Sequence, residues 1–100
     1  MKSVRFVAAA RREFIAELAY YRKVDPALAV RFNHAVEETI MRASSFPTMG
    51  SPGAAGTRRV FLRDFPFAVI YRIDEDGIVI FALAHHARRP GYWRTRDKEQ

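Results

Sequence analysis

Arginines, histidines and aromatic rings gather near the end of the chain. The stretch His85–Arg96 reads HHARRPGYWRTR and holds four arginines, two histidines, one tyrosine and one tryptophan, with no acidic residue. Arginine can clamp a phosphate or a carboxylate through two parallel hydrogen bonds, and a neighbouring aromatic face can stack on a base. Protein interfaces are also enriched in tryptophan, tyrosine and arginine. The stretch therefore suits a contact with nucleic acid or with protein, or a simpler role in which Trp93 covers the edge of a sheet.

Metal-independent cleavage of RNA would need a base together with cations that stabilise the developing phosphorane charge. Arginine stays protonated and is a poor base, so the base would have to be His85 or His86. The three lysines (Lys2, Lys23 and Lys98) lie outside the strands expected in the second half of the chain. These residues do not identify a catalytic group by themselves. For a nuclease, the candidate set would be His86, Arg63, Arg72, Arg88 and Arg89.

No metal or cofactor site is predicted. His85 and His86 are adjacent at the end of an apolar strand, so their side chains should point to opposite faces and could not converge on one ion. Either ring could instead be half-buried and bonded to backbone. The sequence contains no cysteine, no HExxH and no glycine-rich phosphate loop, which argues against a disulfide framework, a zinc enzyme and a nucleotide-dependent enzyme.

The bulk properties indicate a cytoplasmic protein whose basic charge either serves a polyanionic or acidic partner or has no specific role. No run of 18 apolar residues and no signal-peptide pattern is present, so we expect no membrane segment. The formal net charge is +6, which favours association with polyanions or with an acidic protein. The 100 residues suffice for one domain, predicted to span residues 1–100.

The first half of the chain predicts a strand followed by a helical hairpin. Ser3–Ala8 alternates as a short strand does, and from about Ala9 the apolar period changes to that of a helix. Pro26 disfavours helical geometry at Asp25 and can begin a second helix, which Asp25 would cap. That second helix is expected to end near Ser44. The predicted core positions on the two helices are Phe14, Leu18, Phe32 and Val36, with Glu13 among the residues facing away.

The second half predicts an antiparallel meander. Residues 47–57 hold two prolines and three glycines and are expected to form a loop. Strands are expected at Arg59–Arg63, Phe67–Ile73 and Ile78–Ala84, joined by turns at Asp64–Pro66 and Asp74–Gly77. The order β-α-α-β-β-β indicates an α+β fold with a helical hairpin packed on a small, mainly antiparallel sheet. Apolar residues on both faces of 67–84 suggest that a partner or a second copy covers the face that the helices leave open.

Three motifs resemble the RelE/ParE toxin superfamily, and specifically its ParE-like, plasmid-stabilisation branch. The first is an arginine-bearing strand running from Arg63 through FPFAVIY to Arg72. The second is the DEDG turn followed by an apolar strand. The third is His86-Ala-Arg-Arg-Pro-Gly-Tyr-Trp93, which is similar to the "H-x-x-R-x-P-x-x-W" ending of the family. Its spacing departs from the family pattern, because Pro90 directly follows Arg89 and the family arginine could match either Arg88 or Arg89.

This resemblance implies the toxin of a type II toxin–antitoxin system, neutralised by a cognate antitoxin and able to form a heterotetramer with it. ParE toxins inhibit DNA gyrase, whereas RelE toxins are ribosome-dependent mRNA endonucleases. A third alternative is a degenerate, non-toxic member that acts with its antitoxin only in autoregulation. The lack of a lysine cluster and of an acid–base pair favours the ParE type, acting by contact and not as an enzyme, and without binding nucleic acid on its own. The expected contacts with target or partner are Arg88, Arg89, Tyr92, Trp93, Phe65 and Phe67, although the two phenylalanines flanking Pro66 could equally serve packing.

Overall fold

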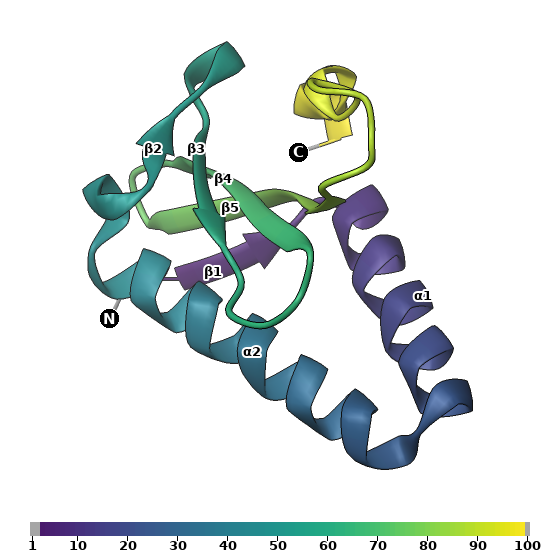
Figure 1. Ribbon diagram of the computed structural model, residues 1–100. Coiled ribbons are helices and arrows are strands. Elements are labelled where there is room, and N and C mark those ends of the chain that lie inside the picture. Colours follow the sequence, from purple (N-terminus) through teal and green to yellow (C-terminus); the bar gives the residue numbers. More distant parts are fainter. Residues whose placement is uncertain (1–2, 100) are drawn as a thin grey trace.

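A helical hairpin packs on one face of a five-stranded sheet, as Figure 1 shows. The computed structural model describes residues 3–99 and the side chains of residues 3–96. No helix in residues 3–99 combines the length and apolar character needed to cross a membrane. The predicted α+β class is confirmed. The elements are β1 (Ser3–Phe6), α1 (Ala8–Val24), α2 (Pro26–Ser45), β2 (Ser51–Pro52), β3 (Arg58–Phe61), β4 (Phe67–Ile73) and β5 (Gly77–His85), with short 3-10 helices η1 (Pro47–Met49), η2 (Ala54–Gly56) and η3 (Arg94–Glu99).

The break between the two helices forms as predicted. Asp25 has extended backbone angles, and its N–H group donates to the carbonyl of Tyr21, which ends α1. The Asp25 carboxylate then accepts a hydrogen bond of 3.0 Å from the N–H of Ala27, and Pro26 occupies the first turn of α2. One residue therefore ends one helix and caps the next, since the first amides of a helix have no partner within the helix.

Replacing Asp25 with alanine should lower the free energy of unfolding by about 1 kcal/mol, because the Ala27 amide loses its acceptor. Urea denaturation monitored by circular dichroism would measure the change. Asp25→Asn keeps an acceptor oxygen and is the matched control, expected to unfold close to wild type. An Asp25→Ala variant as stable as Asp25→Asn would contradict the capping role.

The strand order in the sheet is β1-β5-β4-β3-β2. The meander β3–β4–β5 is antiparallel, and β1 runs parallel to β5, with Ser3 opposite Gly77 and Phe6 opposite Ile80. The expected loop at 47–57 contains a strand that the sequence did not predict: β2 pairs with β3 through Ser51 and Pro52. A strand of two residues is too short to show an alternating pattern of apolar and polar residues. The prolines and glycines were therefore the only signal in this segment, and they predicted a loop.

The turn between β4 and β5 also holds β1 in place. The Asp74 carboxylate accepts hydrogen bonds from the N–H groups of Asp76 and Gly77, at 3.0 and 2.9 Å, and forms an ion pair with Arg5 of β1. The hydrogen bond from Arg5 is the main cause that lowers the pKa of Asp74. A Cβ atom at Gly77 would lie 1.9 Å from the carbonyl oxygen of Ser3, so glycine at this position allows β1 to approach β5.

Phe32 of α2 lies at the centre of the core. It is fully buried, and its ring contacts four other aromatic rings, with centroid separations of 4.8 to 6.2 Å: Phe14, Tyr21, Phe65 and Phe67. These contacts join both helices to the β3–β4 connection and to β4. The predicted helix stripe of Phe14, Leu18, Phe32 and Val36 does belong to this core or pack against it.

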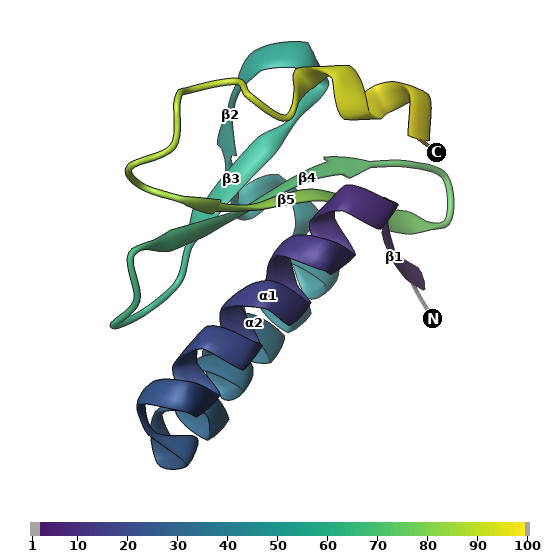
Figure 2. The same cartoon turned by 90° about the vertical axis from the view of Figure 1, so that its right-hand side faces the viewer.

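The chain itself covers both faces of the central strands. Residues 67–71 and 77–83 are all buried. Figure 2 shows the C-terminal segment, residues 86–99, on the face of the sheet opposite the helices. Trp93 of that segment is only 7 % exposed and belongs to the core. The expectation that a partner must cover this second face is therefore wrong for β4 and β5, because a segment after the last strand folds back over them.

Candidate functional site

A groove of about 560 Å³ is lined by the C-terminal segment on one side and by residues of β2, η2 and β3 on the other. We call it the cationic groove. Its basic side chains come from both sides, with Arg59 on β3 and the others after or at the end of β5, and no aspartate or glutamate among residues 3–96 lines it. The basic residues are Arg59, His85, His86, Arg88, Arg89 and Arg94. An acid-free set of arginines concentrates positive potential in a concave site, which favours anionic ligands.

The strands contribute small and apolar residues to the same groove. Ala68 and Ile70 of β4 and Ala84 of β5 lie among its lining residues, together with Trp93. Arg59 stacks over the ring of Phe61, with its guanidinium carbon 5.1 Å from the ring centroid. The groove therefore combines apolar strand residues with arginines. Such an arrangement can hold a ligand that carries apolar groups together with carboxylates or phosphates.

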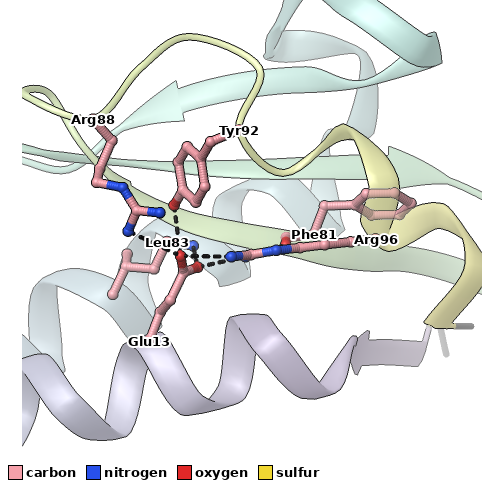
Figure 3. Close-up of polar contacts among 6 residues, drawn as sticks. All are labelled: Glu13, Phe81, Leu83, Arg88, Tyr92 and Arg96. Atoms are coloured by element: carbon pink, nitrogen blue, oxygen red, sulfur yellow. Dashed lines mark hydrogen bonds and ion pairs between the residues drawn. The ribbon is translucent and has the colours of Figure 1, made fainter.

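One carboxylate of α1 holds the C-terminal segment against the sheet (Figure 3). Arg96 donates to both oxygens of Glu13 at 2.7 and 2.9 Å, and the Tyr92 hydroxyl donates to Glu13 at 2.6 Å. The backbone N–H of Leu83 on β5 donates to the same carboxylate at 3.1 Å. Glu13 was expected to face away from the core. That expectation is wrong, since its side chain is only 16 % exposed.

The contacts around Glu13 extend to an arginine of the groove. Arg88 lies over the Tyr92 ring, 3.7 Å from its centroid, and 3.8 Å from a Glu13 oxygen. Burial is the main cause that raises the pKa of Tyr92 well above its ordinary value, and the hydrogen bond to Glu13 raises it further. The phenol therefore remains a hydrogen-bond donor to Glu13 throughout the physiological pH range. Arg96 also donates to the carbonyl of Phe81, so the segment is bound to both α1 and β5.

The structure brings together most of the residues predicted after the last strand. His86, Arg88, Arg89, Tyr92 and Trp93 all line the cationic groove. Within this group Trp93 is buried, so its ring serves the core, as the sheet-covering interpretation proposed. Arg88 and Arg89 are exposed.

The other predicted residues lie elsewhere. Arg63 and Phe65 line a different groove beside α2, where Arg63 is 4.0 Å from Glu38. Arg72 stacks over the ring of Phe81, at 4.8 Å, and does not line the cationic groove. Phe67 is 1 % exposed and packs on Phe32, which is the packing role left open for it. The candidate nuclease set is thus split between separate regions.

The two adjacent histidines contact different phenylalanines. The His85 ring packs edge-on against Phe67, and the His86 ring packs edge-on against Phe61 of the groove. His85 Nδ1 accepts a hydrogen bond of 2.9 Å from the N–H of Ala87, as expected for a histidine bonded to backbone. The two rings thus have different aromatic partners, although both histidines belong to the lining of the cationic groove.

Sequence reasoning missed Glu13 and Arg59 as parts of this site. Arg59 was expected at the start of a strand, but nothing in the sequence indicated that this strand would lie beside the end of the chain. Glu13 gave no signal, because an acidic residue beside two arginines on an amphipathic helix has the pattern of a solvent-exposed position. Only the return of the C-terminal segment to α1 gives this carboxylate its role.

The chain matches known proteins over most of its length. The family described as "ParE toxin of type II toxin-antitoxin system, parDE" matches residues 4–90. A relative named "Putative toxin Y4kP", from Sinorhizobium fredii (strain NBRC 101917 / NGR234), is 29 % identical over 90 residues, which are 89 % of this chain and 94 % of the relative.

A similar fold occurs in a solved structure, described as "Chromosomal ParDE TA system from P. aeruginosa". One of its chains superposes with a TM-score of 0.72 and 19 % identity, covering 85 % of this chain and 96 % of that one. At this identity the likeness supports the fold alone. The family match, in contrast, spans β1 through Pro90 and includes both helices and the whole meander. The chain therefore belongs to the ParE toxin family of type II toxin–antitoxin systems.

Proposed function

We propose that this chain is a growth-inhibiting toxin that acts on DNA gyrase by direct contact and is neutralised by a cognate antitoxin. Its membership of the ParE family supports both parts of the proposal. The description of that family as the toxin of a type II toxin–antitoxin system supports a protein antitoxin as the partner. A gyrase target also implies action in the cytoplasm, where the chromosome lies.

One observation supports this proposal most directly. The groove is rich in cations, but neither of its histidines is paired with a carboxylate that would orient it as a general base. In residues 3–96, neither His85 nor His86 is hydrogen-bonded to a carboxylate, and no acidic residue lines the groove. A general base needs a partner that orients it, as a rule a carboxylate or carbonyl. Arg63 and Arg72 also lie outside the groove. This arrangement favours binding over metal-independent cleavage of RNA. The exposed Arg88 and Arg89 are the side chains that we expect at the contact with target or partner.

The test is induced expression in bacterial cells with pulse labelling of DNA and protein synthesis. We expect DNA synthesis to fall first and translation to follow later, and purified toxin to inhibit supercoiling by gyrase in vitro. Co-expression of the cognate antitoxin, to be sought in a small reading frame adjacent to the toxin gene, should restore growth.

Two other outcomes would replace the proposal. Early collapse of protein synthesis, abolished by His86→Ala while antitoxin binding survives, would indicate a ribosome-dependent endonuclease. Expression without growth arrest, despite a folded protein, would indicate a non-toxic member that serves in autoregulation.

A further inference from the structure

We infer that Glu13 and Tyr92 are positioning residues for Arg88, and that they hold its guanidinium in place for contact with an anionic group of the target. Figure 3 shows the three side chains together, Glu13 from α1 and the other two from the C-terminal segment. The inference deepens the proposed function and rests on it for the identity of the target. The positioning of Arg88 is a property of the free chain and can be measured without gyrase.

The Glu13 carboxylate attracts Arg88 without accepting a hydrogen bond from it. One carboxylate oxygen accepts from the Leu83 N–H and from Arg96, and the other accepts from the Tyr92 hydroxyl and from Arg96. An ionised carboxylate has about four acceptor sites, so these hydrogen bonds fill it. An Arg88 nitrogen lies 3.8 Å from a Glu13 oxygen, beyond hydrogen-bond distance but within reach of the attraction between opposite charges.

The Tyr92 ring holds the same guanidinium from a second direction. The central carbon of the Arg88 guanidinium lies 3.7 Å from the ring centroid, so the two planar groups are in van der Waals contact. The Tyr92 hydroxyl donates to Glu13 at 2.6 Å, which keeps the ring beside the carboxylate. Arg59 of the same groove is farther from its aromatic partner, 5.1 Å from the Phe61 centroid. Arg88 is therefore the more closely held of these two cations.

These contacts leave the hydrogen-bond donors of Arg88 available to a ligand. The Arg88 side chain is 53 % exposed. The ring contacts a face of the guanidinium, whereas the N–H groups lie in the guanidinium plane and form a fork that matches a carboxylate or phosphate. An arginine that is held in place beforehand also loses less side-chain entropy when it binds.

Glu13 does not cancel the positive charge of this cluster. Arg88 and Arg96 carry two positive charges against the single negative charge of Glu13, so the carboxylate cannot neutralise both. Arg96 lies 2.7 Å from Glu13 and takes most of its charge, whereas Arg88 at 3.8 Å takes less. An anion of the target can therefore pair with Arg88 while Glu13 remains bound to Arg96.

Nuclear magnetic resonance of the arginine side chains in the free, full chain tests the positioning. The heteronuclear NOE of the Arg88 Nε–Hε group, assigned by its loss in Arg88→Lys, is compared with that of Arg89. We expect Arg88 to be the more ordered of the two, and its order to fall from wild type through Tyr92→Phe to Tyr92→Leu. Both Tyr92 variants lose the hydroxyl, so the difference between them reports the ring.

The Glu13 charge is tested in the same way. Glu13→Gln keeps an acceptor oxygen but removes the charge, and should make Arg88 more mobile. Glu37→Gln is the matched control, because this glutamate is exposed on α2 and should leave the order of Arg88 unchanged. The Trp93 indole signal and circular dichroism check that the segment stays packed and each variant folded. If Glu13→Gln does not fold, the two Tyr92 variants still decide the result.

A double-mutant cycle on inhibition of gyrase supercoiling tests whether the held cation is used. Glu13→Gln should raise the toxin concentration for half inhibition by about two- to fivefold, as loss of a partly exposed charge contact does. In an Arg88→Gln background the same substitution should have less than about a twofold effect, because its partner is already gone. In an Arg89→Gln background it should keep its full effect.

Three results would overturn the inference. An Arg88 side chain as mobile as Arg89 would show that it is not held. Unchanged order of Arg88 in both Glu13→Gln and Tyr92→Leu would show that other contacts hold it. Equal effects of Glu13→Gln in the two arginine backgrounds would show that Glu13 acts only through the whole C-terminal segment. If the wild-type chain does not inhibit gyrase, the proposed function fails, and the side-chain measurements still decide whether Glu13 and Tyr92 position Arg88.

Discussion

Replacing Phe32 with alanine is expected to lower the free energy of unfolding by about 3–5 kcal/mol. Phe32 is fully buried, and its ring joins α1, α2, β4 and the β3–β4 connection through contacts with Phe14, Tyr21, Phe67 and Phe65. Alanine would remove this ring and leave a cavity that four surrounding rings cannot fill without moving. A domain of 100 residues typically has a free energy of unfolding of about 5–15 kcal/mol, so the expected loss is a large fraction of the total stability.

Urea denaturation followed by tryptophan fluorescence would measure this change, since the single tryptophan, Trp93, lies buried in the same domain. Phe46→Ala is the matched control, because Phe46 is 67 % exposed at the end of α2. We expect its unfolding free energy to stay within about 0.5 kcal/mol of wild type. Similar effects of the two substitutions would show that Phe32 does not hold the layers together.

Replacing Glu13 with alanine should cost about 2–4 kcal/mol of stability. The substitution leaves the Arg96 guanidinium, itself only 13 % exposed, without its bidentate partner. It also removes the acceptor for the Tyr92 hydroxyl and for the Leu83 amide. Removing the carboxylate that faces a largely buried cation, and leaving two donors without their acceptor, costs more free energy than the same contacts would contribute at a solvent-exposed position. Glu13→Gln keeps an acceptor oxygen and should lose about half as much.

Two measurements separate local from global effects of the Glu13 substitution. Urea denaturation reports the whole domain, whereas amide hydrogen exchange at residues 92–96 reports release of the C-terminal segment from the sheet. Glu37→Ala on α2 is the control, since this glutamate is exposed and should change stability by less than about 0.5 kcal/mol. Normal exchange protection at residues 92–96 in Glu13→Ala would contradict the role of Glu13 as the contact that holds this segment.

Local patterns in the sequence predicted the elements of the fold. The change from an alternating to a helical period near Ala9, the Asp25–Pro26 break and the DEDG turn each depend on a few neighbouring residues, so they can be recognised without knowing the tertiary structure. The order of elements and the α+β class follow from these signals. Strand β2 lies below the length at which such a pattern exists, and was missed for that reason.

The candidate site could be predicted only where its residues are close together in the sequence. His86, Arg88 and Arg89 share one short segment and do meet in the groove, whereas Arg63 and Arg72, grouped with them by chemistry alone, lie elsewhere. Arg63 and Arg72 lie away from the groove because of their positions on or beside the strands. The register of a strand decides which face of the sheet each of its side chains faces, and chemistry alone does not predict that register.

The sequence by itself determined the two helices with the Asp25 cap between them, the meander and the basic segment at its end, because caps, turns and hydrophobic periods depend on neighbouring residues. Only the tertiary structure decided that this segment folds back over the open face of the sheet, that Arg59 faces it across a groove, and that Glu13 binds it from α1. Those contacts join residues as far as 83 positions apart, and a pairing over such a distance is chosen by the packing of the whole chain and leaves no trace in local sequence.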